Sequence, residues 1–408
     1  MSTGTRARHY EALQAGVMTV FLGCLRFRRW CWQGVAAGCA VAMVASCGVA
    51  GAKGGPRRSP AASAGSVVRA VSSPSPSPVL GYQLNGVAAV SAASAWAVGT
   101  TNRITGQVIR WDGQDWQRVP APGAGYFNGV AAISTADAWA VGAGQGNTAL
   151  IEHWDGTVWA SVAAPSTGGP AVLRAVAAVS PGDVWAVGGT NFTGKTVILH
   201  WDGTTWRRVS SPTPPGISSQ LDGVAATSAT NAWAVGDTFT KTGQVPLIEH
   251  WNGTAWRQVP GPALPAAGAL KGVAATSVTN AWAVGASTGA LIEHWNGRAW
   301  TRVPAPPLSM GGLDGVTALS ATSAWAVGTT VGKSRRMASV IERWNGTSWA
   351  RVPSPAADLL VSVTATSARN AWAVGFSTGG VTGIIEHWNG TSWACLPATS
   401  TAGPCPPG

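Results

Sequence analysis

Residues 270–304 read LKGVAATSVTNAWAVGASTGALIEHWNGRAWTRVP. The stretch contains four short apolar runs separated by turn-forming residues, at 272–277, 281–285, 290–295 and 299–304. Asn296 and Gly297 form an Asn-Gly pair, which favours the positive φ angles of a type I′ hairpin turn between the last two runs. Runs of this length, with no helix-length periodic segment between them, predict four antiparallel β-strands.

This unit occurs seven times, and 21 of the 23 tryptophans occupy three fixed positions in it. The first opens a Trp-Ala-Val-Gly motif: Trp96, Trp139, Trp185, Trp233, Trp282, Trp325 and Trp372. The second begins Trp-Asp/Asn-Gly: Trp111, Trp154, Trp201, Trp251, Trp295, Trp344 and Trp388. The third follows five positions later: Trp116, Trp159, Trp206, Trp256, Trp300, Trp349 and Trp393. Four strands repeated seven times, 43 to 49 residues apart, predict an all-β fold, a seven-bladed β-propeller with four antiparallel strands per blade.

We name the strands of each blade A to D from the axis outward. The small residues of strand A suit a crowded centre, and the prolines and arginines of strand D suit an outer edge. The tryptophans are then expected to fill the space between blades, each removing surface worth roughly 4–6 kcal/mol before entropy is counted. The seventh blade can complete itself, or residues 68–74, which resemble 206–212, can pair with it as a clasp.

The composition argues against two classes of protein. A chain that is 46% hydrophobic and only 11% charged is too apolar to be disordered. The net charge is +11, of which residues 1–47 contribute +4. The remaining +7 is spread thinly, without a basic stripe interleaved with aromatic residues, so we expect no nucleic-acid partner.

Residues 1–47 have the layout of an export signal, in which the basic segment 26–30 precedes the uncharged segment 34–49. Val44-Ala-Ser-Cys47 resembles a bacterial lipobox, which predicts lipidation of Cys47 and tethering to the outer face of the cytoplasmic membrane. An uncleaved membrane anchor is the second possibility, because the apolar run 34–52 is about long enough to span a bilayer. Cleavage followed by secretion is the third. Residues 1–17 lie far upstream and are consistent with a mis-called start.

Two further features concern the ends of the repeat region. Residues 48–79 are rich in Ala, Gly, Ser and Pro, so we expect a flexible tether before a propeller at 80–408. Cys395 and Cys405 close a short loop rich in Pro and Gly, and they are expected to form a disulfide if the protein is exported.

The motifs resemble two groups of propeller repeats. Trp-Ala-Val-Gly followed by Trp-Asp-Gly-Xaa-Xaa-Trp looks like the kelch and galactose-oxidase-type blade. Segments 180–188 and 200–206 also resemble the Asp-box repeats of sialidases and photosystem II assembly factors. The resemblance covers residues 80–397 and implies the fold. It carries over no catalytic residues and no cofactor, because the copper and sialidase sites need tyrosines, and Tyr10 and Tyr82 lie before the first Trp-Ala-Val-Gly motif, which leaves only Tyr126.

The histidines and glutamates of strand C invite a metal or catalytic interpretation. The histidines precede the second tryptophan: His153, His200, His250, His294 and His387. Glutamates precede the histidine position: Glu152, Glu249, Glu293, Glu342 and Glu386. Because the repeat places them on different blades, we expect packing or hydrogen bonding and predict no metal site.

The loops differ between repeats on one face only. Strands alternate in direction, so B–C and D–A loops emerge together, and both vary in length and sequence, whereas the A–B and C–D turns are nearly constant. Function usually lies on variable loops over a rigid frame, so we predict that this face binds a ligand. The candidate residues are Tyr126, Phe127, Phe192, Lys195, Asp237, Phe239, Lys241, Lys333, Arg335 and Arg336.

Three functions remain open at this point. The first is a non-enzymatic, membrane-tethered propeller that binds an envelope or extracellular protein or a glycan. The second is an extracytoplasmic hydrolase or lyase with an unfamiliar axial site, which carboxylates converging at the axial mouth would favour. The third is an envelope protein with a purely structural role.

Overall fold

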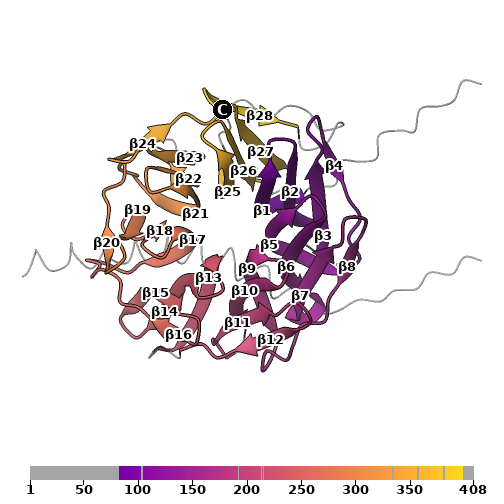
Figure 1. The fold of residues 1–408 in the computed structure, drawn as a ribbon. Coiled ribbons are helices and arrows are strands. Elements are labelled where there is room, and N and C mark those ends of the chain that lie inside the picture. The colour runs from indigo at the N-terminus through magenta and orange to yellow at the C-terminus, as the bar shows by residue number, and fades with distance from the viewer. Residues whose placement is uncertain are drawn as a thin grey trace, which may run out of the picture. The chain divides into compact units, whose positions relative to one another are not determined.

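The computed structural model describes residues 82–397, apart from residues 103, 192, 213, 215, 333, 334, 356, 357, 380 and 381. In this part of the chain, 28 strands form seven four-stranded antiparallel sheets, accompanied by one short 3-10 helix, η1 (Gln145–Asn147). Each sheet consists of the four consecutive strands of one repeat, and the sheets are arranged in a ring (Figure 1). The predicted seven-bladed propeller is therefore confirmed.

The strands follow in A–D order within each blade. Blades 1 to 3 contain β1 (Tyr82–Ser91), β2 (Ser94–Thr101), β3 (Thr105–Trp111), β4 (Trp116–Arg118); β5 (Gly125–Ser134), β6 (Asp137–Gly144), β7 (Ala149–Trp154), β8 (Trp159–Ser161); β9 (Ala171–Ser180), β10 (Asp183–Thr190), β11 (Thr196–Trp201) and β12 (Trp206–Val209). Blades 4 and 5 contain β13 (Ser218–Ser228), β14 (Asn231–Thr240), β15 (Gly243–Trp251), β16 (Trp256–Gln258); β17 (Ala269–Ser277), β18 (Asn280–Ala286), β19 (Ala290–Trp295) and β20 (Trp300–Arg302). Blades 6 and 7 contain β21 (Gly311–Ser320), β22 (Ser323–Val331), β23 (Met337–Trp344), β24 (Trp349–Val352); β25 (Leu359–Ser367), β26 (Asn370–Phe376), β27 (Gly383–Trp388) and β28 (Trp393–Leu396).

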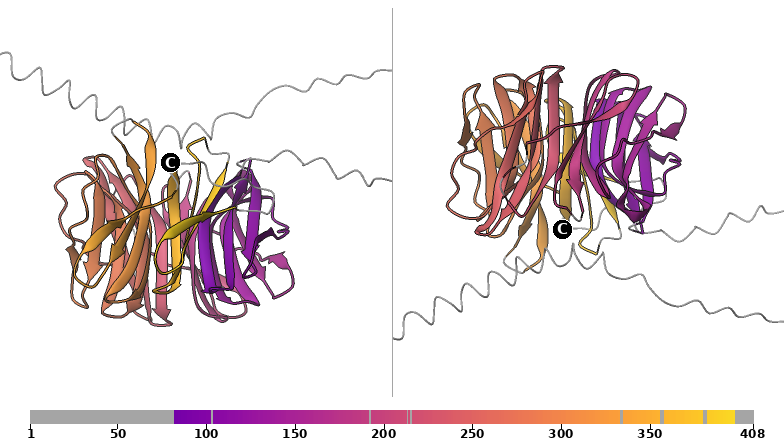
Figure 2. Two further views of the ribbon diagram at one scale, coloured as in Figure 1. Left: turned by 90° about the horizontal axis from the view of Figure 1, so that it is seen from above. Right: turned by 90° about the horizontal axis from the view of Figure 1, so that it is seen from below.

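The A strands of neighbouring blades contact one another around the axis, and β1 contacts β25 to close the ring. In the described residues, blade 7 takes all four strands from its own repeat, so it completes itself. The alternative clasp, 68–74, lies outside the described residues. The strands run between two loop-bearing faces (Figure 2).

Glycine allows the A strands to approach closely at the axis. A Cβ on Gly223 would lie 3.0 Å from the backbone oxygen of Lys271 on the next blade, and a Cβ on Gly272 would lie 3.0 Å from that of Asp314. Such contacts are tighter than ordinary packing allows. The resulting channel is lined by the A strands and encloses about 220 Å³.

The tryptophans join neighbouring blades, as predicted. The first tryptophan of each repeat is at most 2% exposed. Trp282 of blade 5 lies with its ring centroid 4.9 Å from Trp344 and 5.2 Å from Trp349 of blade 6. Trp372 of blade 7 makes the equivalent contacts with Trp111 of blade 1. The rings therefore form the apolar contact between sheets in a chain that has few large aliphatic residues.

The C–D turns differ from the predicted type I′ geometry. Trp295 pairs with Trp300, so four residues form the loop. Gly297 has a φ of +91°, but no asparagine or aspartate in these turns has a positive φ, which a type I′ turn would require. Instead Asn296 Oδ1 accepts hydrogen bonds from the backbone N–H groups of Arg298 and Ala299, and the equivalent side chain does the same in every blade. The predicted type I′ geometry is therefore wrong, because the side chain of the asparagine or aspartate provides the closing hydrogen bonds.

Several sequence predictions fall outside the described residues. These are the export leader at 1–47 with Cys47, and the tether at 48–79. Cys395 lies in β28 as a half-cystine, but Cys405 is not described, so their pairing stays a prediction. Within the described residues there is no helix with the length and hydropathy needed to cross a bilayer.

Candidate functional site

The strand C histidines make contacts within their own blades. His153 Nε2 lies 2.9 Å from Asp137 Oδ1, and its ring lies 4.2 Å from Trp139. His200, His250, His294 and His387 repeat this arrangement with an aspartate or asparagine at the start of strand B. Burial lowers the pKa of His250, His294 and His387. These side chains support the packing of the first tryptophan, as the symmetry argument predicted.

The strand C glutamates are fully buried, at 0% exposure. Glu249 accepts hydrogen bonds from Ser211 Oγ at 3.0 and 2.9 Å, and Glu386 accepts one from Ser354 Oγ at 2.6 Å. Each serine follows strand D of the preceding blade, so the carboxylate holds the loop that joins two blades. Burial raises the pKa of Glu249 and of Glu293 to about 7.

One position of strand A differs between the blades, and its seven residues form a ring that lines the axial channel. The position before the Gly-Val pair, or its equivalent, holds an amide, a cation, a carboxylate or an apolar side chain, depending on the blade. The seven residues are Asn85, Asn128, Arg174, Asp222, Lys271, Asp314 and Val361. In blade 4 the neighbouring Gln220 pairs with Asp237, close to the end of the sheet that bears the B–C hairpin. The ring therefore lies toward the face of the variable loops.

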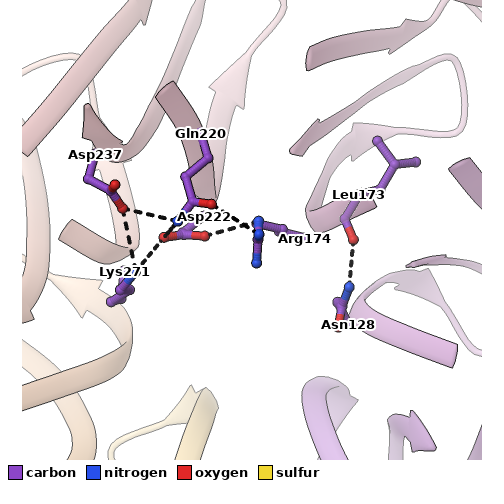
Figure 3. Close-up of polar contacts among 7 residues, drawn as sticks. All are labelled: Asn128, Leu173, Arg174, Gln220, Asp222, Asp237 and Lys271. Atoms are coloured by element: carbon purple, nitrogen blue, oxygen red, sulfur yellow. Dashed lines mark hydrogen bonds and ion pairs between the residues drawn. The ribbon is translucent and has the colours of Figure 1, made fainter. Parts of the chain in front are cut away.

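Polar side chains of this ring connect one blade to the next (Figure 3). Asn128 Nδ2 donates to the backbone oxygen of Leu173 at 2.8 Å. Arg174 Nε lies 3.3 Å from Asp222 Oδ1, and Lys271 Nζ lies 2.7 Å from Asp222 Oδ2. Lys271 Nζ is also 3.6 Å from Asp237 Oδ1, which accepts a hydrogen bond from Gln220 Nε2 at 3.1 Å. The Asn128 contact joins blade 2 to blade 3, and the ion-pair network joins blades 3, 4 and 5.

The sequence analysis missed this network, although it carried a signal. The position is the one in an otherwise constant strand where the repeats differ in charge. Two carboxylates, Asp222 and Asp237, do converge near the axial mouth, which is the arrangement expected of an axial enzyme. Both, however, face the ammonium group of Lys271, and Asp222 also faces the Arg174 guanidinium. These ion pairs fit a blade-to-blade connection.

The variable face has hairpins of unequal height. In every B–C hairpin the glycine of Trp-Ala-Val-Gly pairs with a residue of strand C. Beyond this pair, the hairpin of blade 4 contains four further residue pairs and that of blade 6 contains three. Blade 5, which lies between them, adds only Ala286 with Ala290. At about 3.4 Å per residue, the blade 4 and blade 6 hairpins rise roughly 10 Å and 7 Å above that of blade 5.

The structure corrects four of the candidate residues. Phe127 is 0% exposed within β5 and packs in the core between blades 1 and 2, and Tyr126 is half-buried in the same strand. Asp237 is 0% exposed and Phe239 is half-buried, both in β14. Placing these four in loops was wrong, because strands A and B extend further than the repeat motif indicates. Phe127 and Asp237 offer a ligand no surface.

The remaining candidates that the structure describes are exposed. Lys195 lies in the B–C loop of blade 3, and Lys241 lies in the turn of the blade 4 hairpin. Arg335 and Arg336 lie at the end of the blade 6 hairpin, where Arg335 has a φ of +59°. Phe192 and Lys333 fall outside the described residues. The structure thus separates the candidates into a cationic set near blades 4 to 6 and Lys195 on blade 3.

Exposed charge differs between the two faces. In the part of the chain that is described, every exposed carboxylate lies in a C–D turn: Asp112, Asp115, Asp155 and Asp202. The charged side chains that the described B–C and D–A loops expose are all cations, namely Lys195, Lys241, Arg335 and Arg336. Asp358 is a carboxylate in a D–A loop, but it is only 8% exposed and accepts a hydrogen bond from the Thr378 N–H. The variable face is therefore cationic.

Four of the six large aliphatic side chains that are exposed in the described residues lie on the same face, and the other two, Val158 and Val278, lie in the constant turns. Ile217 precedes β13 and is 69% exposed, and Met310 precedes β21 and is 45% exposed. Val245 lies in the blade 4 hairpin, and Ile104 lies in the B–C loop of blade 1. Exposed apolar residues beside polar ones are typical of interaction surfaces.

An open depression of about 450 Å³ lies at blade 5. Its lining comes from Thr288, Gly289 and Ala290 of the B–C link and from residues 302–308, which lead to blade 6. Among the described residues, no group of three or more His, Cys, Asp or Glu side chains is placed to hold a metal ion.

Comparison with known proteins supports the fold. No protein-family model and no curated protein matches the sequence. Among solved structures, YCF48 bound to D1 peptide is 14% identical with a TM-score of 0.52, covering 76% of this chain and 94% of that one. YCF48 from Cyanidioschyzon merolae is 16% identical with the same TM-score, covering 77% and 97%. The GH74 xyloglucanase of Xanthomonas campestris is 13% identical, also with a TM-score of 0.52. That match covers 77% of this chain and 54% of the xyloglucanase. At these identities the likeness establishes a shared propeller fold.

Proposed function

We propose that this protein is a non-enzymatic binding module, exported and tethered outside the cytoplasmic membrane, which binds an envelope or extracellular protein or glycan through its B–C and D–A loops. The distribution of exposed charge is the observation that carries the proposal. Loops that differ in length, and whose exposed charged side chains are all cations among the described residues, stand on one face of a constant frame. Recognition usually uses such loops over a rigid scaffold.

A similar fold with a bound peptide supports this function. The YCF48 structure in the comparison contains a D1 peptide, so a propeller of this kind can hold a polypeptide. The strand C glutamates are fully buried, and the half-buried strand C histidines hydrogen-bond within their own blades, which leaves the loops as the variable chemistry.

The test measures capture of envelope proteins and binding to a glycan array by the full-length protein. The matched pair is Arg335→Glu/Arg336→Glu on the variable face and Arg298→Glu/Arg369→Glu in the constant turns. We expect the first pair to abolish a specific interaction and the second to leave it intact. Loss of the interaction in the second pair, or no specific ligand on either platform, would overturn the proposal.

The tether is tested separately. The lipobox predicts that the protein is labelled by a fatty acid in cells and that Cys47→Ala abolishes the label. Labelling of Cys47→Ala to the normal extent would contradict lipidation at this residue.

A second candidate is an extracytoplasmic hydrolase or lyase with an axial site. The meeting of Asp222 and Asp237 at Lys271 favours it. It predicts that polysaccharide or peptide cleavage by the full-length protein is lost in Asp237→Asn. Cleavage that is absent from the wild-type protein, or unchanged in the variant, would exclude it.

A further inference from the structure

The height of the B–C hairpins changes from blade to blade across blades 4 to 6 of the variable face. The blade 4 and blade 6 hairpins stand above blade 5, and the open depression lies at the lower blade between them. Gly289 and Leu308 come from the two sides of the depression, and a Cβ on Gly289 would lie 3.6 Å from the Leu308 oxygen. The surface here is concave, which suits a chain segment better than a flat surface does.

The rim of this region is cationic. Lys241 lies at the turn of the blade 4 hairpin, and Arg335 and Arg336 end the blade 6 hairpin. Arg302 lines the depression itself and is exposed. No exposed carboxylate is described on this face, so these cations have no exposed acidic neighbour in its described loops. A ligand with negative charges would complement the rim.

Aliphatic side chains accompany the cations. Ile217 and Val245 are exposed on blade 4, Met310 precedes blade 6, and Leu308 lines the depression. The backbone oxygen of Met310 accepts hydrogen bonds from Val331 N–H at 3.0 Å and Thr330 Oγ1 at 2.8 Å, which fixes this residue against the blade 6 hairpin. Aliphatic surface beside cations matches a polypeptide with acidic and apolar side chains. A glycan would match exposed aromatic rings instead, because sugar faces stack on them.

We infer that blades 4 to 6 bind an extended acidic segment of a partner protein, with its carboxylates at Lys241, Arg335 and Arg336 and an apolar side chain in the blade 5 depression. This inference rests on the proposed function and names its partner class. Binding through charged groups at an exposed rim accelerates association and weakens as salt is added.

The test uses a fluorescent eight-residue peptide of alternating Glu and Leu with the full-length protein. We expect saturable binding that weakens with added salt, and at least about tenfold weaker binding in Lys241→Glu/Arg335→Glu/Arg336→Glu, since reversal removes attraction and adds repulsion. Lys195→Glu, a reversal on the same face at blade 3, is the matched control and should change affinity less than about twofold. A Gln-Leu peptide should not bind.

A second pair of variants tests the depression without changing charge. Gly289→Trp fills it, and nothing nearer than 3.6 Å opposes the new Cβ. Gly182→Trp places the same side chain in an A–B turn of the opposite face, where the nearest atom is at 3.7 Å. We expect loss of peptide binding in the first and retention in the second. Equal binding by both variants would overturn the placement.

Two other probes separate anionic partners of different kinds. Tighter binding to polygalacturonate, or to phosphatidylglycerol vesicles, than to the Glu-Leu peptide would overturn the peptide assignment. A partner captured normally by Lys241→Glu/Arg335→Glu/Arg336→Glu, but lost on changes elsewhere on the variable face, would refute this inference and leave the proposed function standing. Absence of any specific partner would refute both.

Discussion

The replacement of Glu293 by Leu tests the energetics of the buried strand C carboxylates. Glu293 is 0% exposed, and neither carboxylate oxygen has a hydrogen-bond partner among the described residues. Burial raises its pKa from 4.5 to about 7, against the opposing charge of Arg302. Leu199 occupies the equivalent position in blade 3, so the fold already accepts leucine there.

The direction of the pH effect follows from proton binding. Between pH 4.5 and 7 the folded state keeps a proton on Glu293 that the unfolded chain has released, so stability is greatest below this window and falls as the pH rises through it. The pKa change corresponds to about 3 kcal/mol. Glu293→Leu removes this loss, so its stability relative to wild type should improve by about 3 kcal/mol between pH 4.5 and pH 8.

The assay is urea unfolding followed by tryptophan fluorescence at pH 4.5, 6 and 8. The lowered pKa of His294 gives stability that rises with pH toward 6.5, but it is present in both proteins and cancels in the difference. Leu199→Met is the control, and its effect should not depend on pH. A difference between Glu293→Leu and wild type that is the same at all three pH values would refute the reasoning.

Two further predictions concern the frame. Trp282→Ala should destabilise the protein by about 3–5 kcal/mol, because it empties a fully buried contact between blades 5 and 6, whereas Trp295→Ala, which is half-exposed, should cost less in the same urea titration. Asp222→Ala should cost about 2 kcal/mol by leaving Arg174 and Lys271 without their shared carboxylate; the figure is below that for a fully buried pair because both cations are about a quarter exposed. An Asp222→Ala protein as stable as wild type would show that the axial network does not hold the blades together.

The sequence was sufficient to predict the number of blades and the order of their strands, because the same strand and turn motifs occur seven times. Each Trp-Ala-Val-Gly motif marks a buried strand, and each Trp-Asp/Asn-Gly motif marks the next turn, so blade number and strand order followed directly. The turn type did not follow, because Asn-Gly allows several geometries and the closing bonds come from the side chain of Asn296 and its equivalents.

The candidate site was predicted less completely. The face could be named because loop length varies there, and Lys241 and Arg335 are exposed as expected. Phe127 and Asp237 were misplaced, since the repeat does not reveal how far a strand continues past its motif. The contact of Asp222 with Lys271 joins residues 49 positions apart, and only the ring brings them together.

Hydrogen exchange of the full-length protein with and without its bound partner tests the central claim, that a constant frame presents one recognition face. We predict slowed exchange in residues 237–246, 303–310 and 329–338, and unchanged exchange in the constant turns at 112–115, 155–158 and 202–205. Protection confined to those constant turns would contradict the claim.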